Sequence, residues 1–190
     1  MFGIFARFAR EKGVRRTRAR VRKIHKRNML ANEVFVVVEN IRSAENVGSL
    51  FRTADALGIQ KIFLCGITPI PISIGRKPGT DKIAKTALGA EQTVAWEYAS
   101  QTWRVAEQLK RKGVRVVALE QSPKSIALQK FEPKFPLALV LGNEVNGVSS
   151  AVLKRCDNVV EIPMRGQKES LNVAVAFGIA AYQIVKHESP

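Results

Sequence analysis

A pair of polar side chains stands immediately before the last apolar segment of the chain. Ser170 and Asn172 follow a β-rich run and a turn that contains Pro163 and Gly166, and they precede the apolar residues 173–185. A serine at the start of a helix caps free backbone N–H groups, and a helix N-terminus attracts anionic groups. The segment therefore predicts either a ligand-binding helix N-terminus or, more simply, a strand, a turn and a capped core helix.

A second polar cluster follows the first strand-like run. Asn46 and Gly48 begin an expected helix, and Arg52 lies on the same helix, so that Asn46 and Arg52 can approach the same end of it. The alternative is purely structural. Arg52 would then pair with Asp55, three positions further along the helix, and Asn46 would only cap the helix.

A third polar cluster, the Gly142–Ser149 loop, follows another apolar strand-like run. It contains Asn143 and Glu144 between two glycines, Gly142 and Gly147. Glycines let the backbone turn tightly or come close to a ligand. The alternative interpretation is a plain turn whose Glu144 is solvated.

Short apolar, β-branched runs alternate with helical patterns from Glu33 onward, and such runs suit a sheet that is covered on both faces. The expected strands are Val34–Val38, Lys61–Cys65, Thr93–Trp96, Val114–Leu119, Leu137–Leu141 and Val159–Ile162, and the expected helices are Val47–Leu57, Trp103–Arg111 and Leu171–Val185. The alternation predicts a single α/β domain with a mostly parallel sheet and helices on both faces. The three polar clusters then follow the carboxyl ends of strands, where open α/β sheets bind ligands.

Several familiar catalytic motifs are missing from the sequence. No Gly-x-Gly occurs, which excludes the dinucleotide fingerprint and the glycine-rich loop of common Rossmann methyltransferases. There is no Walker loop, no His-Glu-x-x-His and no paired-cysteine motif, so no metal site is expected. His25 and His187 lie near the two ends of the chain, which argues against histidine-based catalysis. A site made of Arg, Asn, Glu, Ser and backbone groups suits an enzyme that orients a reactive cofactor.

The net charge of +15 is concentrated at the N-terminus, because residues 1–30 carry eleven Lys and Arg against a single Glu11. Such an arm indicates a polyanionic partner, and we interpret it as an RNA-binding arm. Phe2, Phe5 and Phe8 recur at helical spacing, so a packed structural helix is an alternative. A cleaved organellar transit peptide and an amphipathic membrane-surface helix are two further alternatives.

The rest of the composition is that of an ordinary globular protein, and 190 residues correspond to about one domain. No apolar run reaches the roughly 18 residues that a membrane span needs, so no membrane helix is expected. Cys65 and Cys156 lie in or beside apolar runs without metal or redox spacing. They are expected to be reduced core residues of a cytoplasmic protein.

Taken together, the three clusters resemble the motifs of the SpoU (TrmH-like) RNA 2′-O-ribose methyltransferases of the SPOUT superfamily. The matching residues occur in the family's order: Asn46 and Arg52, then Gly142-Asn143-Glu144 with Gly147, then Ile162-Pro163-Met164 with Ser170-Leu171-Asn172. The resemblance implies a catalytic domain at residues 33–187, behind a basic arm at residues 1–32. It also implies S-adenosylmethionine as cofactor, a C-terminal trefoil knot, a homodimer, and tRNA or rRNA as substrate, with no DNA or membrane partner.

The resemblance assigns roles within the clusters. The implied catalytic residues are Arg52, Asn46, Glu144, Ser170 and Asn172, and the implied cofactor-binding residues are Leu119, Leu141, Gly142, Asn143, Ile162, Met164, Ser170 and Leu171. A sulfonium methyl is already electrophilic, so the enzyme must align it with a ribose 2′-oxygen and help to remove the proton. Because a guanidinium has a pKa above about 12, we interpret Arg52 as a clamp on phosphate or on the developing alkoxide, and leave a role as base open.

A catalytically silent RNA-binding or ribosome-assembly protein with the same fold is the alternative function. The motif residues are all present, which favours the enzyme. A cytoplasmic location is expected, although the basic N-terminus leaves import into an organelle open.

Overall fold

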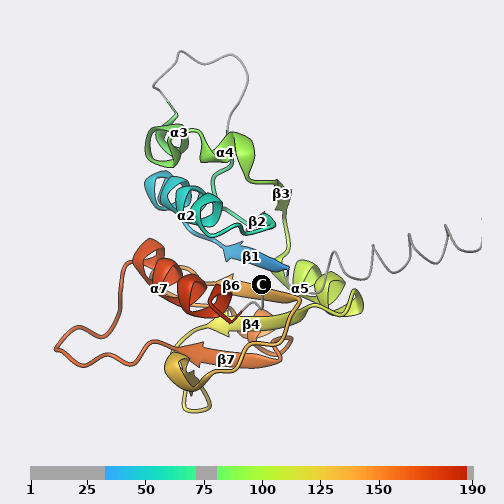
Figure 1. The fold of residues 1–190 in the computed structure, drawn as a ribbon, viewed down its shortest axis with the longest axis vertical. Helices are drawn as coiled ribbons and strands as arrows, with labels where there is room; N and C mark the ends of the chain where they lie inside the picture. Colours follow the sequence, from blue (N-terminus) through green and yellow to red (C-terminus); the bar gives the residue numbers. More distant parts are fainter. Residues whose placement is uncertain (1–32, 72–80, 188–190) are drawn as a thin grey trace, which may run out of the picture. The chain divides into compact units, whose positions relative to one another are not determined.

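The computed structural model describes residues 33–71 and 81–187, which belong to the second of the two units, Met1–Asn32 and Glu33–Pro190, into which the chain divides. These residues form a seven-stranded sheet with the strand order β3-β2-β1-β6-β4-β7-β5 (Figure 1). All six strand pairings are parallel. The predicted α/β class with a parallel sheet is confirmed. The trefoil knot stays a prediction, and the interpretation of the basic arm falls outside the described residues.

The strands and helices alternate for most of the chain. The strands are β1 (Val34–Glu39), β2 (Lys61–Cys65), β3 (Trp96–Ala99), β4 (Arg115–Leu119), β5 (Ile126–Ala127), β6 (Leu137–Leu141) and β7 (Asn158–Glu161). The helices are α2 (Ala44–Ala56), α3 (Lys82–Ala87), α4 (Ala90–Thr93), α5 (Thr102–Arg111), α6 (Ser150–Leu153) and α7 (Val173–Val185), with a 3₁₀ turn at Leu128–Lys130. In this part of the chain, no helix is long and apolar enough to cross a membrane.

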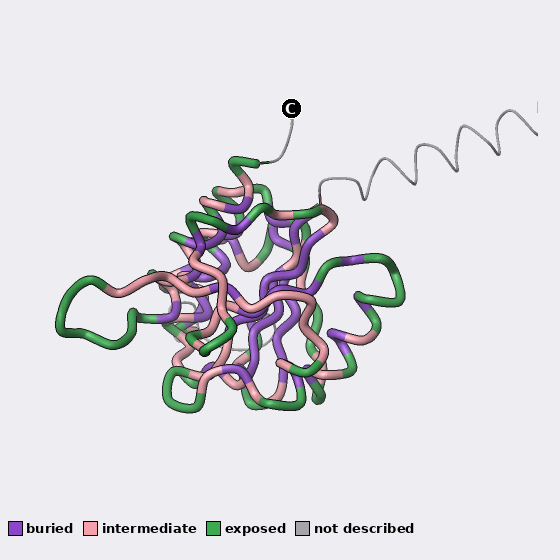
Figure 2. The backbone as a smooth tube through the Cα atoms, turned by 90° about the horizontal axis from the view of Figure 1, so that it is seen from below, coloured by how far each residue is buried: buried purple, intermediate pink, exposed green. Residues whose placement is uncertain are grey.

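Helices cover both faces of the sheet, as predicted, because successive strand residues point to opposite sides. Val36 and Val38 of β1 belong to one core, which they share with residues of α2, α3 and α7, whereas Val37 belongs to a second core with residues of α5 and α6. Figure 2 shows the buried segments gathered in the interior, with exposed backbone in the surrounding turns. Burial on both faces explains why β6 is a continuous apolar run.

The strand predicted at Thr93–Trp96 is wrong for most of its length, because β3 begins only at Trp96. Thr93 is instead the last residue of the short helix α4, while Val94 and Ala95 connect that helix to β3; α4 starts after Gly89, which has a left-handed conformation with a φ of 97°. The Thr93 hydroxyl donates hydrogen bonds to Asp55 and to the Ala90 carbonyl, so Thr93 ends a helix and does not enter the sheet.

The other predicted strands and helices are present. Lys61–Cys65 and Leu137–Leu141 have the predicted bounds, and the remaining elements have one or both ends shifted by one to three residues. Helix α2 starts at Ala44, three residues before the predicted start, because the Ser43 hydroxyl caps it by accepting the Asn46 N–H. No pattern in the sequence indicated α3, α4, α6 or β5. Each has six residues or fewer, too short for a clear helical or alternating pattern.

Candidate cofactor and active site

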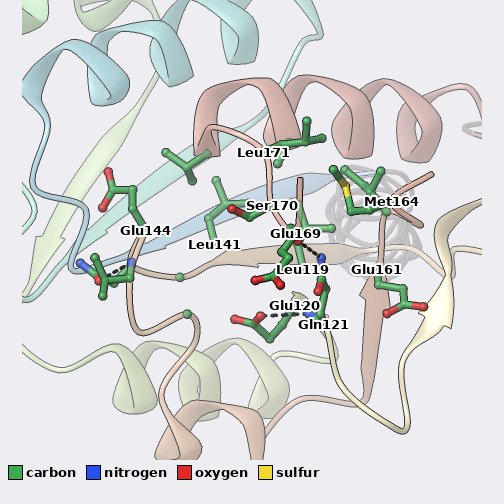
Figure 3. A pocket seen from close by; sticks show the side chains of 17 residues that line it. Leu119, Glu120, Gln121, Leu141, Glu144, Glu161, Met164, Glu169, Ser170 and Leu171 are labelled. Carbon is green, nitrogen blue, oxygen red and sulfur yellow. Dashed lines mark hydrogen bonds between the residues drawn. The ribbon is translucent and has the colours of Figure 1, made fainter. Parts of the chain in front are cut away.

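Three parallel strands end side by side at the edge of the sheet where the polar clusters lie. The register pairs Leu119 at the end of β4 with Leu141 at the end of β6 and with Val160 near the end of β7. The loops that follow these strands enclose a cavity of about 310 Å³ (Figure 3). The cavity therefore lies where an open parallel sheet binds its ligands.

The structure brings all eight predicted cofactor-binding residues into the wall of this cavity. They are Leu119, Leu141, Gly142, Asn143, Ile162, Met164, Ser170 and Leu171. Sequence reasoning missed further lining residues, namely Glu120, Gln121, Val145, Gly147, Glu161, Glu169, Val173 and Ala176. Glu120 and Gln121 directly follow Leu119, so their position after a strand end was the signal that could have found them.

The Gly142–Ser149 loop is closed by its own backbone. Asn143 and Gly147 exchange two backbone hydrogen bonds of 3.0 and 2.9 Å. A Cβ on Gly142 would lie 2.2 Å from the Gly147 carbonyl carbon, so only glycine allows this approach. Gly147 has a φ of 64° in the left-handed region, which also favours glycine. The loop is thus a turn that is closed into a ring beside the cavity, and its Glu144 is exposed, as the plain-turn alternative expects, while it also lines the cavity.

The Asn143 side chain forms hydrogen bonds with backbone groups of the protein. Its Oδ1 accepts the backbone N–H groups of Val145 and Asn146, and its Nδ2 donates to the Asn40 carbonyl over 2.8 Å. At the end of the loop, both the backbone N–H and the hydroxyl of Ser149 donate to the buried Glu39 carboxylate, each over 2.9 Å. These bonds attach the loop to the end of β1.

Asn46 connects the three polar clusters. Its Nδ2 donates to Glu144 Oε1 over 3.1 Å, and its Oδ1 accepts a hydrogen bond from Asn172 Nδ2, also over 3.1 Å. The three residues are far apart in the sequence and meet at one side of the cavity, where Glu144 also lines the wall. The interpretation of Asn46 as the cap of α2 is wrong, since Ser43 caps that helix.

Arg52 lies apart from this network. It is an exposed residue of α2 and does not line the cavity. Its expected structural partner, Asp55, accepts a hydrogen bond from the Thr93 hydroxyl over 2.6 Å, and among the described residues no ion pair of Arg52 is found. Neighbouring Thr53 faces Gly178 of α7, so this part of α2 lies beside that helix.

The N-terminus of α7 is capped by Asn172 and not by Ser170. The Asn172 Oδ1 accepts the Ala174 N–H over 2.9 Å, and α7 begins at Val173. The prediction of Ser170 as a cap is therefore wrong, because it lies two positions too early. Ser170 is exposed and its side chain lies at the cavity wall.

Both cysteines are free thiols. Burial raises the pKa of the Cys65 thiol to about 12, and burial together with the negative charge of Asp157 does the same for Cys156. Neither thiol is a nucleophile at neutral pH. Within residues 33–71 and 81–187, no group of His, Cys, Asp and Glu side chains is arranged to hold a metal ion.

The comparisons with known proteins agree on one family. The sequence model of the SpoU rRNA Methylase family matches residues 33–182. A 23S rRNA (guanosine-2′-O-)-methyltransferase RlmB from Ralstonia nicotianae is 32% identical over 156 residues, which cover 82% of this chain and 59% of the relative. The RlmB of Shewanella oneidensis is 33% identical over 151 residues, 80% of this chain and 58% of the relative. The chain thus spans less than two thirds of these relatives.

A solved structure has the same fold. The AdoMet-bound rRNA methyltransferase from Sinorhizobium meliloti superposes with a TM-score of 0.71 at 25% identity, and the match covers 84% of this chain and 58% of that one. The residues that the family model matches, 33–182, include the sheet, the residues that line the cavity and all three polar clusters. The chain therefore belongs to the SpoU rRNA methylase family.

Proposed function

We propose that the protein is an S-adenosylmethionine-dependent RNA 2′-O-ribose methyltransferase that acts on tRNA or rRNA. The observation that carries this proposal is that residues of all three motifs meet beside one cavity, where Asn46 is hydrogen-bonded to both Glu144 and Asn172. The family membership supports it, since two matched relatives are named as guanosine-2′-O-methyltransferases of 23S rRNA.

The cavity fits the proposed cofactor in size and in chemistry. Its volume of about 310 Å³ is within the range of small-molecule sites. The apolar side chains of Leu119, Leu141, Ile162, Met164 and Leu171 would hold the adenine between them, and loop backbone groups would supply its polar partners. When bound, the cofactor supplies an electrophilic methyl group.

The polar residues would act on the RNA and on the 2′-hydroxyl. Glu144, Asn46 and Asn172 form one hydrogen-bonded array, which would orient the ribose. Ser170 would place its exposed hydroxyl at the cavity wall beside the ribose. Arg52 would hold a phosphate or stabilise the alkoxide that develops as the proton leaves, since a guanidinium stays protonated.

We infer a homodimer from the outer face of α7. Val175, Ile179 and Tyr182 recur at helical spacing and are 51%, 44% and 65% exposed, and Leu171 at the cavity is also exposed. A second copy of the chain would cover this stripe. Because α2 lies beside α7, the same association would bring Arg52 of one copy near the cavity of the other. Analytical ultracentrifugation tests the homodimer: the unchanged protein should sediment as a dimer and Tyr182→Asp as a monomer. An unchanged protein that sediments as a monomer would exclude the homodimer.

The basic arm would add sequence-independent phosphate contacts, whatever the substrate. Deleting residues 1–30 should weaken RNA binding and flatten its dependence on salt, because fewer counterions are released. An unchanged salt slope would exclude the arm as a phosphate contact. A cytoplasmic location is part of this proposal, and the two free thiols support it.

Calorimetry and RNA mapping test the proposed function. The purified protein should bind S-adenosylmethionine, and RNA from a deletion strain should lack one or more ribose methyl groups. A protein that binds RNA but has no affinity for S-adenosylmethionine would be the silent RNA-binding alternative. The mapped position also decides between tRNA and rRNA.

A further inference from the structure

Glu120 is the first residue after β4, and both of its carboxylate oxygens are hydrogen-bonded. Oε2 accepts the backbone N–H of Val148 over 2.8 Å, and Oε1 accepts the backbone N–H of Gln121 over 2.9 Å. Val148 is only 4% exposed, so its N–H group has little access to water as a substitute partner. The Glu120 carboxylate therefore satisfies a buried donor of the Gly142–Ser149 loop.

The loop is fitted directly against this carboxylate. A Cβ on Gly147 would lie 2.1 Å from Glu120 Oε2, so no larger residue fits there while the carboxylate keeps its place. A hydrogen bond to an ionised acceptor is stronger than one between neutral groups. Glu120 thus fixes the position of the Gly147–Val148 peptide relative to the end of β4.

The next residue, Gln121, reaches the other loop. Its Nε2 donates to the Glu169 backbone carbonyl over 2.6 Å, in the segment Ile162–Asn172 (Figure 3). Two consecutive residues at one strand end therefore hold the two loops that enclose the cavity. Neither residue belongs to the three motifs of the family resemblance.

We propose that Glu120 and Gln121 are positioning residues that set the spacing between the two cofactor loops. They act through the backbone groups of Val148 and Glu169, so the cavity has its binding geometry before the ligand arrives. The role of both residues in cofactor binding rests on the proposed function, whereas their effect on the loops of the free protein does not.

Hydrogen exchange of the ligand-free protein tests the positioning directly. Glu120→Gln keeps the size of the side chain but turns one acceptor into a donor, which then faces an N–H group. We expect exchange at the Val148 amide to become at least about tenfold faster than in the unchanged protein, since the bond is lost when the NH2 group faces Val148 and has only a neutral acceptor when the amide oxygen faces it. Glu132→Gln, an exposed residue away from the cavity, is the matched control and should leave the exchange unchanged.

Gln121→Ala tests the second loop independently of the first. It should loosen the segment Ile162–Asn172 and leave the Val148 amide protected, the reverse of the pattern for Glu120→Gln. Unchanged exchange in both variants, or an equal increase throughout the sheet, would overturn the proposal, the second because it indicates general destabilisation.

Titration with S-adenosylmethionine gives the functional measurement. Both variants should bind the cofactor roughly tenfold more weakly, while kcat at saturating cofactor stays within about threefold of the unchanged value. A fall in kcat with unchanged cofactor affinity would contradict a positioning role. If the unchanged protein does not bind the cofactor at all, the proposed function fails, but the exchange experiment still decides whether Glu120 and Gln121 hold the loops.

Discussion

The two loops around the cavity are constructed in opposite ways. The Gly142–Ser149 loop is closed on itself by the Asn143–Gly147 bridge and is held from outside by Glu39 and Glu120. The segment Ile162–Asn172 has exposed residues from 165 to 172 and is attached to the rest of the protein through hydrogen bonds of Glu169 and Asn172. One loop is closed by backbone hydrogen bonds and has exposed residues only at 144–146, and the other is open to solvent along most of its length.

This contrast suggests a division of labour between the two sides of the cavity. A preformed backbone ring lowers the entropy cost of binding a small ligand, so the Gly142–Ser149 loop should determine cofactor affinity. On the open side, the polar side chains of Ser170 and Asn172 should determine turnover, together with Arg52, whereas the backbone position of the segment, held by Gln121, should contribute to cofactor affinity. Substitutions of these three side chains should therefore change kcat, and substitutions that displace either loop should change cofactor affinity.

The largest expected effect is on turnover. Arg52→Ala should lower kcat roughly a hundredfold, the usual cost of losing a group that stabilises developing charge, and should leave cofactor affinity unchanged. Lys112→Ala removes the same charge from the exposed end of α5 and is the control. Steady-state kinetics with a cofactor titration measure both quantities. Near-normal turnover in Arg52→Ala would reduce Arg52 to a surface residue of α2.

The next largest effect is on stability and comes from the Gly142–Ser149 loop. Gly147→Ala should destabilise the protein by about 2–4 kcal/mol, because it adds left-handed strain and displaces the Glu120 carboxylate from Val148. Gly58→Ala is a matched control, since Gly58 has a φ of 68° and open space around it, and should cost only about 1–2 kcal/mol. Denaturant unfolding gives both values. Equal destabilisation of the two variants would mean that the contact with Glu120 contributes nothing.

A smaller effect is expected where the two sides meet. Asn172→Asp keeps the oxygen that caps α7 but removes the donor to Asn46, so stability should hold while turnover falls about tenfold. Asn172→Ala removes the cap as well and should cost about 1 kcal/mol in addition. Thermal unfolding and kcat of the two variants separate the roles. Full activity of Asn172→Asp would show that the bond to Asn46 is not needed for turnover.

The smallest effect should come from the thiols, which lie on neither side. With the pKa of both thiols at about 12, alkylation of the native protein at neutral pH should be roughly a thousandfold slower than for a free cysteine. Methyl transfer should be unaffected by brief treatment with iodoacetamide. Rapid labelling of Cys65 or Cys156, read by mass spectrometry, would contradict the burial of these groups.

The sequence predicted the sheet well because its central strands are covered on both faces and are therefore continuously apolar. The eight residues that it predicted to bind the cofactor line one cavity, because parallel strands place their carboxyl ends at one edge, and their role in binding stays a prediction. It missed Glu120 and Gln121, since their partners are backbone groups of residues far along the chain. It misassigned the caps at Asn46 and Ser170, because a cap depends on where a helix starts, and helix ends are weakly encoded by hydrophobic spacing.

The most direct test of the proposed activity is the position of the transferred methyl group. The purified protein is incubated with isotope-labelled S-adenosylmethionine and RNA from a deletion strain, with and without a chelator, and the nucleosides are analysed by mass spectrometry. We expect label on a ribose 2′-oxygen, in equal amounts with and without the chelator, since no group of three or more His, Cys, Asp and Glu side chains among the described residues is arranged to hold a metal ion. Label on a base, or a reaction that stops when the chelator is added, would contradict the account.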